Sequence, residues 1–268
     1  MSRFDSVYQF YTSKEKVRSP ERLDWNFKPG FKEEIIAAGK PVVVSNYFTN
    51  KEVSFYVSVL KEKYGAKKVN IRVVNSDTVK EYQAEREYRQ TAISDYLLAQ
   101  STSGYMANVK IEDFVLQDFG LSYPDLYPAE SYALPSIWIG SENSHTPLHR
   151  DSSDNFVFQL AGTKKWTIFN VQDNDCLYFE ESDYGKQGHP LSEFAISNVD
   201  IRNPDLVQFP RFVKAQKIEF ELTPGDFLYL PMGIGHSVTN CDFSIMVNLW
   251  LDLDKEQPGV LKKNKQAL

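Results

Sequence analysis

The sequence predicts a mainly β fold with added helices, and three observations lead to that prediction. From residue 136 onward, short apolar runs are separated by Gly, Pro and Asn turn residues, which is typical of a sandwich or barrel. The residues before this point mix helix and strand patterns. Hydrophobic residues make up 42% of the chain and include 18 Phe and 15 Tyr, which is enough for a packed core. We therefore expect residues 1–268 to form a single domain.

The N-terminal part, residues 1–130, is expected to form an α/β region ahead of the β core. Its first 30 residues, interrupted by Pro20 and Pro29, are expected to lie over the core as an ordered arm. Apolar spacing and β-branched runs then predict helices at 31–38, 51–64 and 92–99, and strands at 41–45, 68–74 and 104–110. The last of these strands directs Tyr105 and Ala107 to one side.

The β core is expected over residues 131–252. Its predicted strands cover 137–140, 155–160, 166–170, 215–222, 227–230, 237–239 and 244–251. Between them, residues 173–210 are rich in Asp, Glu, Ser, Gly, Asn and Pro, and we interpret them as a long loop that forms a lid or faces the substrate. Residues 253–268 are polar and are expected to form a frayed tail.

Charge and cysteine content limit the function classes. A net charge of −6 argues against a broad nucleic-acid surface, although a local basic groove stays open. Cys176 and Cys241 are too few for a disulfide framework and lack CxxC spacing, so we expect buried packing residues rather than ligands. With no signal pattern and no apolar run of about 18 residues, the chain is expected to be cytoplasmic and free of membrane contact; a nuclear location stays open.

The most informative pattern is His149-Arg150-Asp151, followed far downstream by His236. On a strand, His149 and Asp151 point to the same face while Arg150 turns away. Two imidazoles and one carboxylate on one side of an ion leave its other side open, which is the ligand set of non-haem Fe(II) oxygenases. Alone, a His-x-Asp pair is more often a surface hydrogen bond or a turn feature. The pattern makes an iron enzyme the leading hypothesis.

The segment before His236 supports this hypothesis. A Pro224-Gly225 turn feeds an apolar strand that stops at Pro231, and such a strand would deliver His236 to the same end of a barrel as His149.

His145 and His149 have the spacing of two metal ligands on one face of a helix, but Pro147 lies between them and disfavours a helix. We interpret His145 as a loop histidine or, alternatively, as a polar contact on the substrate side. His189 is expected in an exposed loop.

Several strings, taken together, resemble the Jumonji C (cupin-8 type) family of Fe(II)- and 2-oxoglutarate-dependent oxygenases. They are Thr146-Pro147-Leu148-His149-Arg150-Asp151, Asp154-Asn155-Phe156, Gly162-Thr163-Lys164-Lys165-Trp166-Thr167-Ile168-Phe169, Pro224-Gly225-Asp226-Phe227-Leu228-Tyr229-Leu230-Pro231, His236-Ser237-Val238 and Val247-Asn248-Leu249-Trp250. They occur in the family's order over about residues 130 to 252. The resemblance implies a double-stranded β-helix (jelly roll, or cupin) core.

The resemblance also implies roles for single residues. His149, Asp151 and His236 match the iron triad. Lys164, fifteen residues after His149, matches the lysine that pairs with the distal carboxylate of 2-oxoglutarate. The remaining matches are Thr146 and Tyr105 as hydroxyl groups beside that carboxylate, and Asn155 and Asn248 as amides near the other carboxylate. With His236 and Lys164 both in place, the iron site becomes the favoured interpretation of His149 and Asp151.

The cofactors and reaction follow from the same resemblance. They are Fe(II), 2-oxoglutarate as cosubstrate and O2, with ascorbate expected to support turnover; the reaction would hydroxylate a C–H bond and release succinate and CO2. A buried dicarboxylate needs a cation and hydroxyl donors, which Lys164, Thr146 and Tyr105 supply. Asn155 and Asn248 also fit an alternative role, in which they satisfy buried backbone groups.

The substrate stays open between classes. A protein or peptide side chain leads, because an acidic surface suits a basic polypeptide. The alternatives are a small molecule or amino acid, and a modified tRNA base; demethylation is disfavoured because no reader or zinc module is recognisable. An alternative of another class is a noncatalytic, metal-binding cupin interaction module. The oligomeric state is undetermined.

One departure from the family pattern concerns the wall beside the distal histidine. Many relatives place aromatic residues there, whereas this chain has Gly233-Ile234-Gly235, from which we expect a smaller and more flexible wall.

Overall fold

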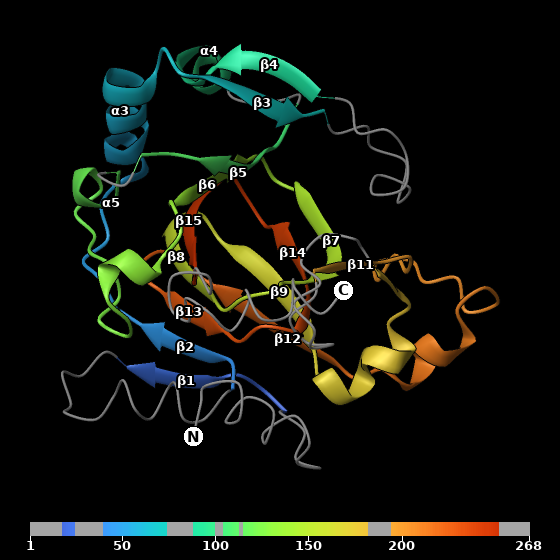
Figure 1. The fold of residues 1–268 in the computed structure, drawn as a ribbon. Coiled ribbons are helices and arrows are strands. Elements are labelled where there is room, and N and C mark those ends of the chain that lie inside the picture. The colour runs from blue at the N-terminus through green and yellow to red at the C-terminus, as the bar shows by residue number, and fades with distance from the viewer. Residues whose placement is uncertain are drawn as a thin grey trace, which may run out of the picture.

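The computed structural model describes residues 18–24, 40–73, 88–99, 104–112, 115–181 and 194–251, and two sheets that face each other form its centre (Figure 1). In order across the first sheet, the seven strands are β1 (Glu21–Asp24), β2 (Val42–Ser45), β13 (Phe227–Leu230), β8 (Asn155–Ala161), β15 (Ser244–Trp250), β6 (Ser136–Gly140) and β5 (Met106–Lys110). The six strands of the second sheet are β10 (Phe179–Glu181), β11 (Ala195–Ser197), β7 (His145–Arg150), β14 (Gly235–Asn240), β9 (Lys164–Phe169) and β12 (Lys217–Leu222).

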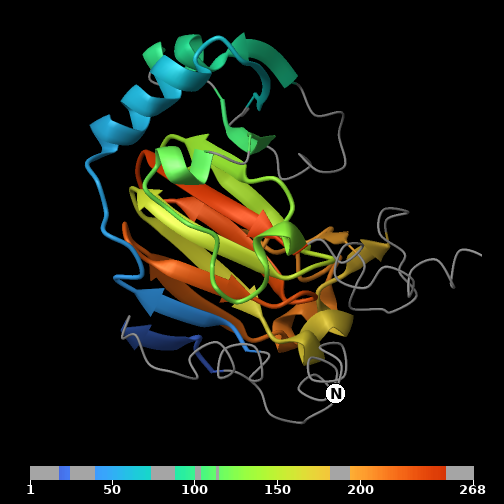
Figure 2. The same ribbon diagram turned by 60° about the vertical axis from the view of Figure 1, so that its left-hand side comes forward.

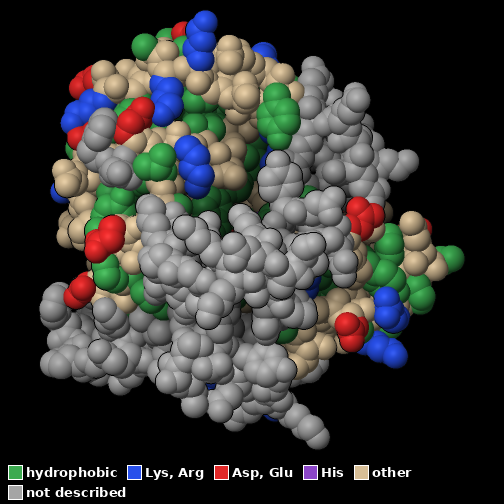
Figure 3. All heavy atoms as spheres, viewed as in Figure 1, with side chains coloured by type: hydrophobic (Ala, Val, Ile, Leu, Met, Phe, Trp, Pro, Cys, Tyr) green, Lys and Arg blue, Asp and Glu red, His purple; other side chains and the backbone are tan. Residues whose placement is uncertain are grey.

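The path of the chain between these sheets confirms the predicted jelly-roll core. From β6 the chain crosses to β7, returns to β8 and crosses again to β9, and the run from β12 to β15 repeats this alternation. All pairings among these eight strands are antiparallel. The central strand β8 is buried along its whole length because both of its faces are covered. On the face shown in Figure 3, apolar side chains lie recessed among charged and polar ones.

The outer face of the seven-stranded sheet is covered by N-terminal elements. The helices α3 (Val53–Tyr64) and α5 (Val115–Asp118) lie on the outside of this sheet (Figure 2). Phe156 of β8 meets the ring of Tyr132 edge to face, with centroids 5.2 Å apart. Complete burial of one such side chain stabilises a fold by about 1.5–3 kcal/mol.

The N-terminal α/β region is partly merged with the core. Its hairpin of β3 (Lys68–Arg72) and β4 (Tyr88–Ala92) leads into α4 (Ile93–Leu98), while β1, β2 and β5 join the core sheet. The helices predicted at 51–64 and 92–99 are confirmed by α3 and α4. The helix predicted at 31–38 lies outside the described residues, as do most of the arm before residue 30, the tail 253–268 and His189.

The prediction of one long loop over residues 173–210 is wrong for its described parts. A 3-10 helix, η3 (Val171–Cys176), leads into β10, and β11 then pairs with both β10 and β7. The pairing of β11 with β7 extends the sheet that carries His149, so this insertion is built onto the core. The described residues also include the short 3-10 helices η2 (Ala129–Ser131) and η5 (Pro210–Lys214).

Two smaller predictions also have clear outcomes. The Pro224-Gly225 turn is confirmed: Gly225 has a φ of 97°, which a residue with a Cβ rarely adopts, and Asp226 accepts hydrogen bonds from the backbone and hydroxyl of Thr223. The expectation that both cysteines are buried is wrong, because Cys176 is half-buried and Cys241 is exposed. Among the described residues, no helix is long and apolar enough to cross a bilayer.

Candidate metal centre

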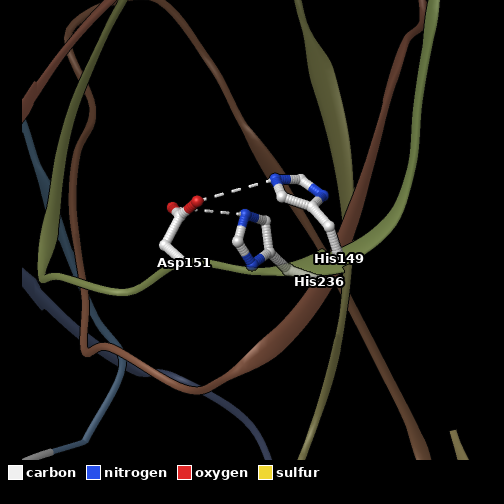
Figure 4. A group of neighbouring side chains, drawn as sticks. All are labelled: His149, Asp151 and His236. Atoms are coloured by element: carbon white, nitrogen blue, oxygen red, sulfur yellow. Dashed lines mark ion pairs between the residues drawn. The ribbon is translucent and has the colours of Figure 1, made fainter. Parts of the chain in front are cut away.

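The three residues of the predicted triad meet at one end of the second sheet. His149 lies near the end of β7, Asp151 directly follows that strand, and His236 lies on β14. These strands are antiparallel neighbours, and their register places His236 directly opposite His149. The two imidazole centroids are 4.1 Å apart, and the Asp151 carboxylate faces both rings (Figure 4). A register shift between His236 and Val238 marks an irregularity of the kind that re-aims side chains.

The ligand atoms of the triad converge on one point. The Nε2 atom of His149 is 3.8 Å from Oδ1 of Asp151, and the Nε2 atom of His236 is 3.7 Å from Oδ2. One ligand atom from each residue lies within 4.8 Å of the other two, and all three residues are buried. This separation suits three ligands of one ion, since Fe(II) or Zn(II) binds nitrogen and oxygen at about 2.0–2.2 Å.

Backbone hydrogen bonds fix which imidazole nitrogen faces the centre. Nδ1 of His149 lies 2.8 Å from the carbonyl of Pro147, and Nδ1 of His236 lies 2.9 Å from the carbonyl of Ile234. Because a carbonyl only accepts, each Nδ1 carries a proton and each Nε2 offers its lone pair to the centre. Burial and the neighbouring His236 hold the pKa of His149 well below its usual range, so its ring is neutral near pH 7. A neutral imidazole is the form that binds a metal.

The Asp151 carboxylate is held by two side-chain donors. Its Oδ2 atom accepts hydrogen bonds from Nδ2 of Asn155 at 2.9 Å and from Nε1 of Trp250 at 3.1 Å. The Asn155 amide oxygen accepts from Nδ2 of Asn248 at 2.8 Å, and the Asn248 oxygen accepts from Nε1 of Trp138 at 2.7 Å. The structure thus places Asn155 and Asn248, for which the resemblance implied a cosubstrate contact, in a chain that ends on Asp151.

Lys164, Tyr105 and Thr146 form a second polar group inside the barrel. Nζ of the fully buried Lys164 donates to Oδ1 of Asn240 at 2.8 Å and to the hydroxyl of Tyr105 at 3.3 Å. A further hydrogen bond joins Tyr105 to Thr146, and burial raises the pKa of Tyr105 to about 12. Burial also lowers the pKa of Lys164 to about 7. Among the described residues, no carboxylate pairs with this amine, so the site fits an anionic ligand.

A cavity joins the triad to Tyr105 and Thr146. It encloses about 310 Å³ including its open mouth. Its lining residues are Tyr105, Trp138, Thr146, His149, Asp151, Asn155, Trp166, His236, Val238, Met246, Asn248 and Trp250. All predicted site residues except Lys164 therefore line one cavity, and Lys164 reaches it through Tyr105. The residue types at its two ends, a cation with hydroxyl groups and a metal-binding triad, match the chemistry of the two ends of a dicarboxylate.

Three functional neighbours were missed by the sequence reasoning. Trp138 and Trp250 carry donors toward the Asp151 side of the cavity, and Asn240 holds Lys164. Trp250 ends one of the strings behind the family resemblance, so a signal for it was present. Trp138 and Asn240 had none, because their contacts depend on strand register.

His145 does not belong to the centre, and its interpretation as a loop residue is wrong. It is a buried residue of β7, which also excludes a helical pair with His149. It lies opposite Thr239 rather than His236, and its Nδ1 is 2.8 Å from the Thr239 hydroxyl. Burial lowers its pKa to about 3, with a further contribution from Arg202, so it is neutral near pH 7.

The glycine beside His236 is packed from the outside. A Cβ at Gly235 would lie 2.9 Å from Cδ1 of Leu177 and 3.1 Å from Cζ of Phe179, both from the insertion. Two apolar side chains of the insertion thus fill the space next to Gly235, and the smaller, more flexible wall expected at residues 233–235 stays a prediction.

Comparison with known proteins gives one family match. A model of the cupin-like domain family (Cupin_8) matches residues 28–257, which include every strand of both sheets except β1 and every residue of the candidate centre.

Individual relatives are more distant. HSPB1-associated protein 1 of Homo sapiens is 33% identical over 147 residues, which are 54% of this chain and 28% of that protein. Lysine-specific demethylase 8 of Xenopus tropicalis is 25% identical over 232 residues, 82% of this chain and 50% of that protein. tRNA wybutosine-synthesizing protein 5 of Homo sapiens is 27% identical over 214 residues, 77% of this chain and 64% of that protein. The chain thus spans less than two thirds of each of these relatives.

Proposed function

Because the chain belongs to the cupin-like domain family of Jumonji C type, we propose that it is an Fe(II)- and 2-oxoglutarate-dependent oxygenase that hydroxylates a C–H bond. The observation that carries this proposal is the convergence of two imidazoles and one carboxylate on one wall of the cavity. That donor set fits Fe(II) and leaves the ion open toward the cavity.

The residues of the chain would divide the work between the two ends of the cavity. His149, Asp151 and His236 would hold the metal, while Lys164, Tyr105 and Thr146 would bind the distal carboxylate of 2-oxoglutarate. The bound ion, with 2-oxoglutarate and O2, would supply the oxidising power, and succinate and CO2 would be released. Trp138, Trp166 and Trp250 line the cavity between these ends and limit the access of water to the reacting groups.

We propose a protein or peptide side chain as the substrate class. The net charge of −6 favours a basic polypeptide over a polyanion such as RNA. One observation favours a modified tRNA base as the second candidate. A protein named for tRNA wybutosine synthesis is 27% identical to this chain over a region that covers 77% of it.

The first experiment tests the reaction. Wild-type protein with Fe(II), ascorbate, O2 and 2-oxoglutarate should form succinate, and Asp151→Ala should abolish that product. Glu219→Ala is the matched control, because it removes a carboxylate that pairs with Lys165 on the exposed side of the barrel. Tight metal binding without succinate across broad substrate panels would instead identify a noncatalytic binding module.

The second experiment tests the substrate class. Intact-mass screening of basic peptides, free amino acids and tRNA should show a gain of one oxygen atom on peptides alone. A gain confined to small molecules or to tRNA would refute the protein-hydroxylase proposal and leave the oxygenase itself intact.

A further inference from the structure

The hydrogen bonds around Asp151 have a fixed direction. The Trp138 indole can only donate, so the Asn248 atom that faces it at 2.7 Å must be the amide oxygen. Asn248 therefore turns its NH2 group to Asn155, and the Asn155 oxygen accepts at 2.8 Å. The NH2 group of Asn155 is then left to donate to Asp151 at 2.9 Å. The indole donor at one end and the carboxylate acceptor at the other thus require the same orientation of both amides.

A second donor reaches the same carboxylate oxygen from β15. Nε1 of Trp250 donates to Oδ2 of Asp151 at 3.1 Å. The ammonium group of Lys110 lies 4.3 Å from the centroid of the Trp250 ring and donates to the carbonyl of Leu134. A cation over the face of an indole draws electron density from the ring, which makes the indole N–H a stronger donor.

Both donors occupy the same oxygen of Asp151. A carboxylate oxygen has two lone-pair positions, and the N–H groups of Asn155 and Trp250 fill both positions on Oδ2. In the part of the chain that the structure describes, no donor reaches Oδ1, which faces Nε2 of His149 at 3.8 Å. Oδ2 lies 3.7 Å from Nε2 of His236, but its lone pairs already accept two hydrogen bonds.

We propose that the relay Trp138–Asn248–Asn155 and the pair Lys110–Trp250 are positioning residues that restrict Asp151 to metal binding through Oδ1 alone. This inference rests on the proposed metal centre and deepens it. It assigns Asn155 and Asn248 a different task from the cosubstrate contact that the family resemblance implied. Single-oxygen binding by Asp151 preserves an open position that binding through both oxygens would fill.

The relay is tested by metal affinity, which does not require turnover. The dissociation constant for Mn(II) is measured anaerobically on the full chain by calorimetry, and the Mn(II) EPR spectrum reports the coordination. Asn155→Leu and Trp250→Phe each remove one donor and should weaken Mn(II) binding about 10- to 100-fold, the usual range for groups that orient metal ligands. Asn248→Leu, one step further away, should weaken it less and should change the EPR spectrum in the same direction.

Tyr229→Phe is the matched control. Its hydroxyl donates at 2.7 Å to Asp154, a buried carboxylate close to Asp151 in sequence that is not part of the triad. This variant should lose thermal stability and keep wild-type Mn(II) affinity, which separates a loss of positioning from a general loss of stability.

If Asn155 and Asn248 contact the cosubstrate instead, their substitution should weaken 2-oxoglutarate binding and not metal binding. The affinity of Mn(II)-loaded protein for 2-oxoglutarate is measured on the same variants. If Asn248→Leu weakens 2-oxoglutarate binding about 10-fold or more and leaves Mn(II) binding and its EPR spectrum unchanged, the relay proposal is wrong. Wild-type protein that binds Mn(II) at the triad but forms no succinate would refute the oxygenase proposal, and the Mn(II) measurements would still decide the relay.

Discussion

The two ends of the cavity hold buried groups of opposite charge in different surroundings. At the metal end, the Asp151 carboxylate is held by Asn155 and Trp250, and two imidazoles face it. At the other end, the Lys164 amine meets only uncharged oxygens of Asn240 and Tyr105 among the described residues, and its pKa falls to about 7. The metal end is arranged before its cation arrives, whereas the lysine end reaches full charge only when an anion is bound.

This contrast predicts that different substitutions can abolish metal binding and anion binding independently. The largest effect is expected at the metal end. Mn(II) at 100 times its dissociation constant should stabilise the wild-type fold by about 2.7 kcal/mol. His236→Ala should abolish that gain, because it removes one of three ligands. His145→Ala, which removes a buried imidazole that bonds to Thr239, should keep it. Thermal unfolding with and without Mn(II) measures the stabilisation of each variant. An equal gain in wild type and both variants would contradict metal binding by the triad.

The next largest effect is expected at the lysine end. Lys164→Met keeps the length of the side chain and removes the charge, so 2-oxoglutarate binding to Mn(II)-loaded protein should weaken about 10- to 100-fold, the loss expected for a hydrogen bond of about 1.5–3 kcal/mol to a charged group. Mn(II) affinity should not change. The control Lys165→Met removes an exposed amine on the next residue, which pairs with Glu219. Equal losses in both variants would argue against a specific role for Lys164.

The lowered pKa of Lys164 predicts a pH dependence of 2-oxoglutarate binding. In the ligand-free protein the amine loses its proton as the pH rises through about 7, while a bound carboxylate favours the charged form and raises that pKa. Binding therefore takes up a proton, and affinity should fall by up to about tenfold per pH unit above pH 7. Titration calorimetry from pH 6 to 9 would show this slope in wild type and none in Lys164→Met. A flat wild-type profile would mean that the amine stays charged without ligand.

The smallest effect is expected from the Tyr105 hydroxyl at the lysine end. Tyr105→Phe removes one hydrogen-bond partner of Lys164 and keeps the ring, so 2-oxoglutarate binding should weaken about 5-fold, equivalent to about 1 kcal/mol. Binding curves with Mn(II)-loaded protein measure this change. A loss as large as that of Lys164→Met would show that the hydroxyl, and not the charge, dominates this end.

The sequence predicted those parts of each cavity end that depend on residues close together in the chain, and it did not predict the contacts that depend on strand register. His149 lies on β7 and Asp151 directly follows that strand, two residues later, so their proximity was readable, and the family strings supplied His236 and Lys164. The partners of Asn155 and Asn248 were not readable, because they depend on the register of β15 against β6 and β8. The same holds for His145, whose burial depends on its place opposite Thr239 across the strand pair.

The insertion escaped prediction for a similar reason. Its composition is that of a loop, and β10 and β11 are only three residues long each. Such short strands are stabilised by pairing rather than by their own propensity: β11 pairs with the edge of β7, and β10 pairs with β11.

The contact at Gly235 couples the sequence of β14 to that of the insertion at residues 173–210. A Cβ at this position would press on the ends of the Leu177 and Phe179 side chains, which lie next to the strand that carries His236. A larger residue there requires these two side chains to move or to be smaller. Residue 235 and the insertion are therefore expected to change together among homologues, and grafting the insertion of one homologue onto the barrel of another tests this coupling.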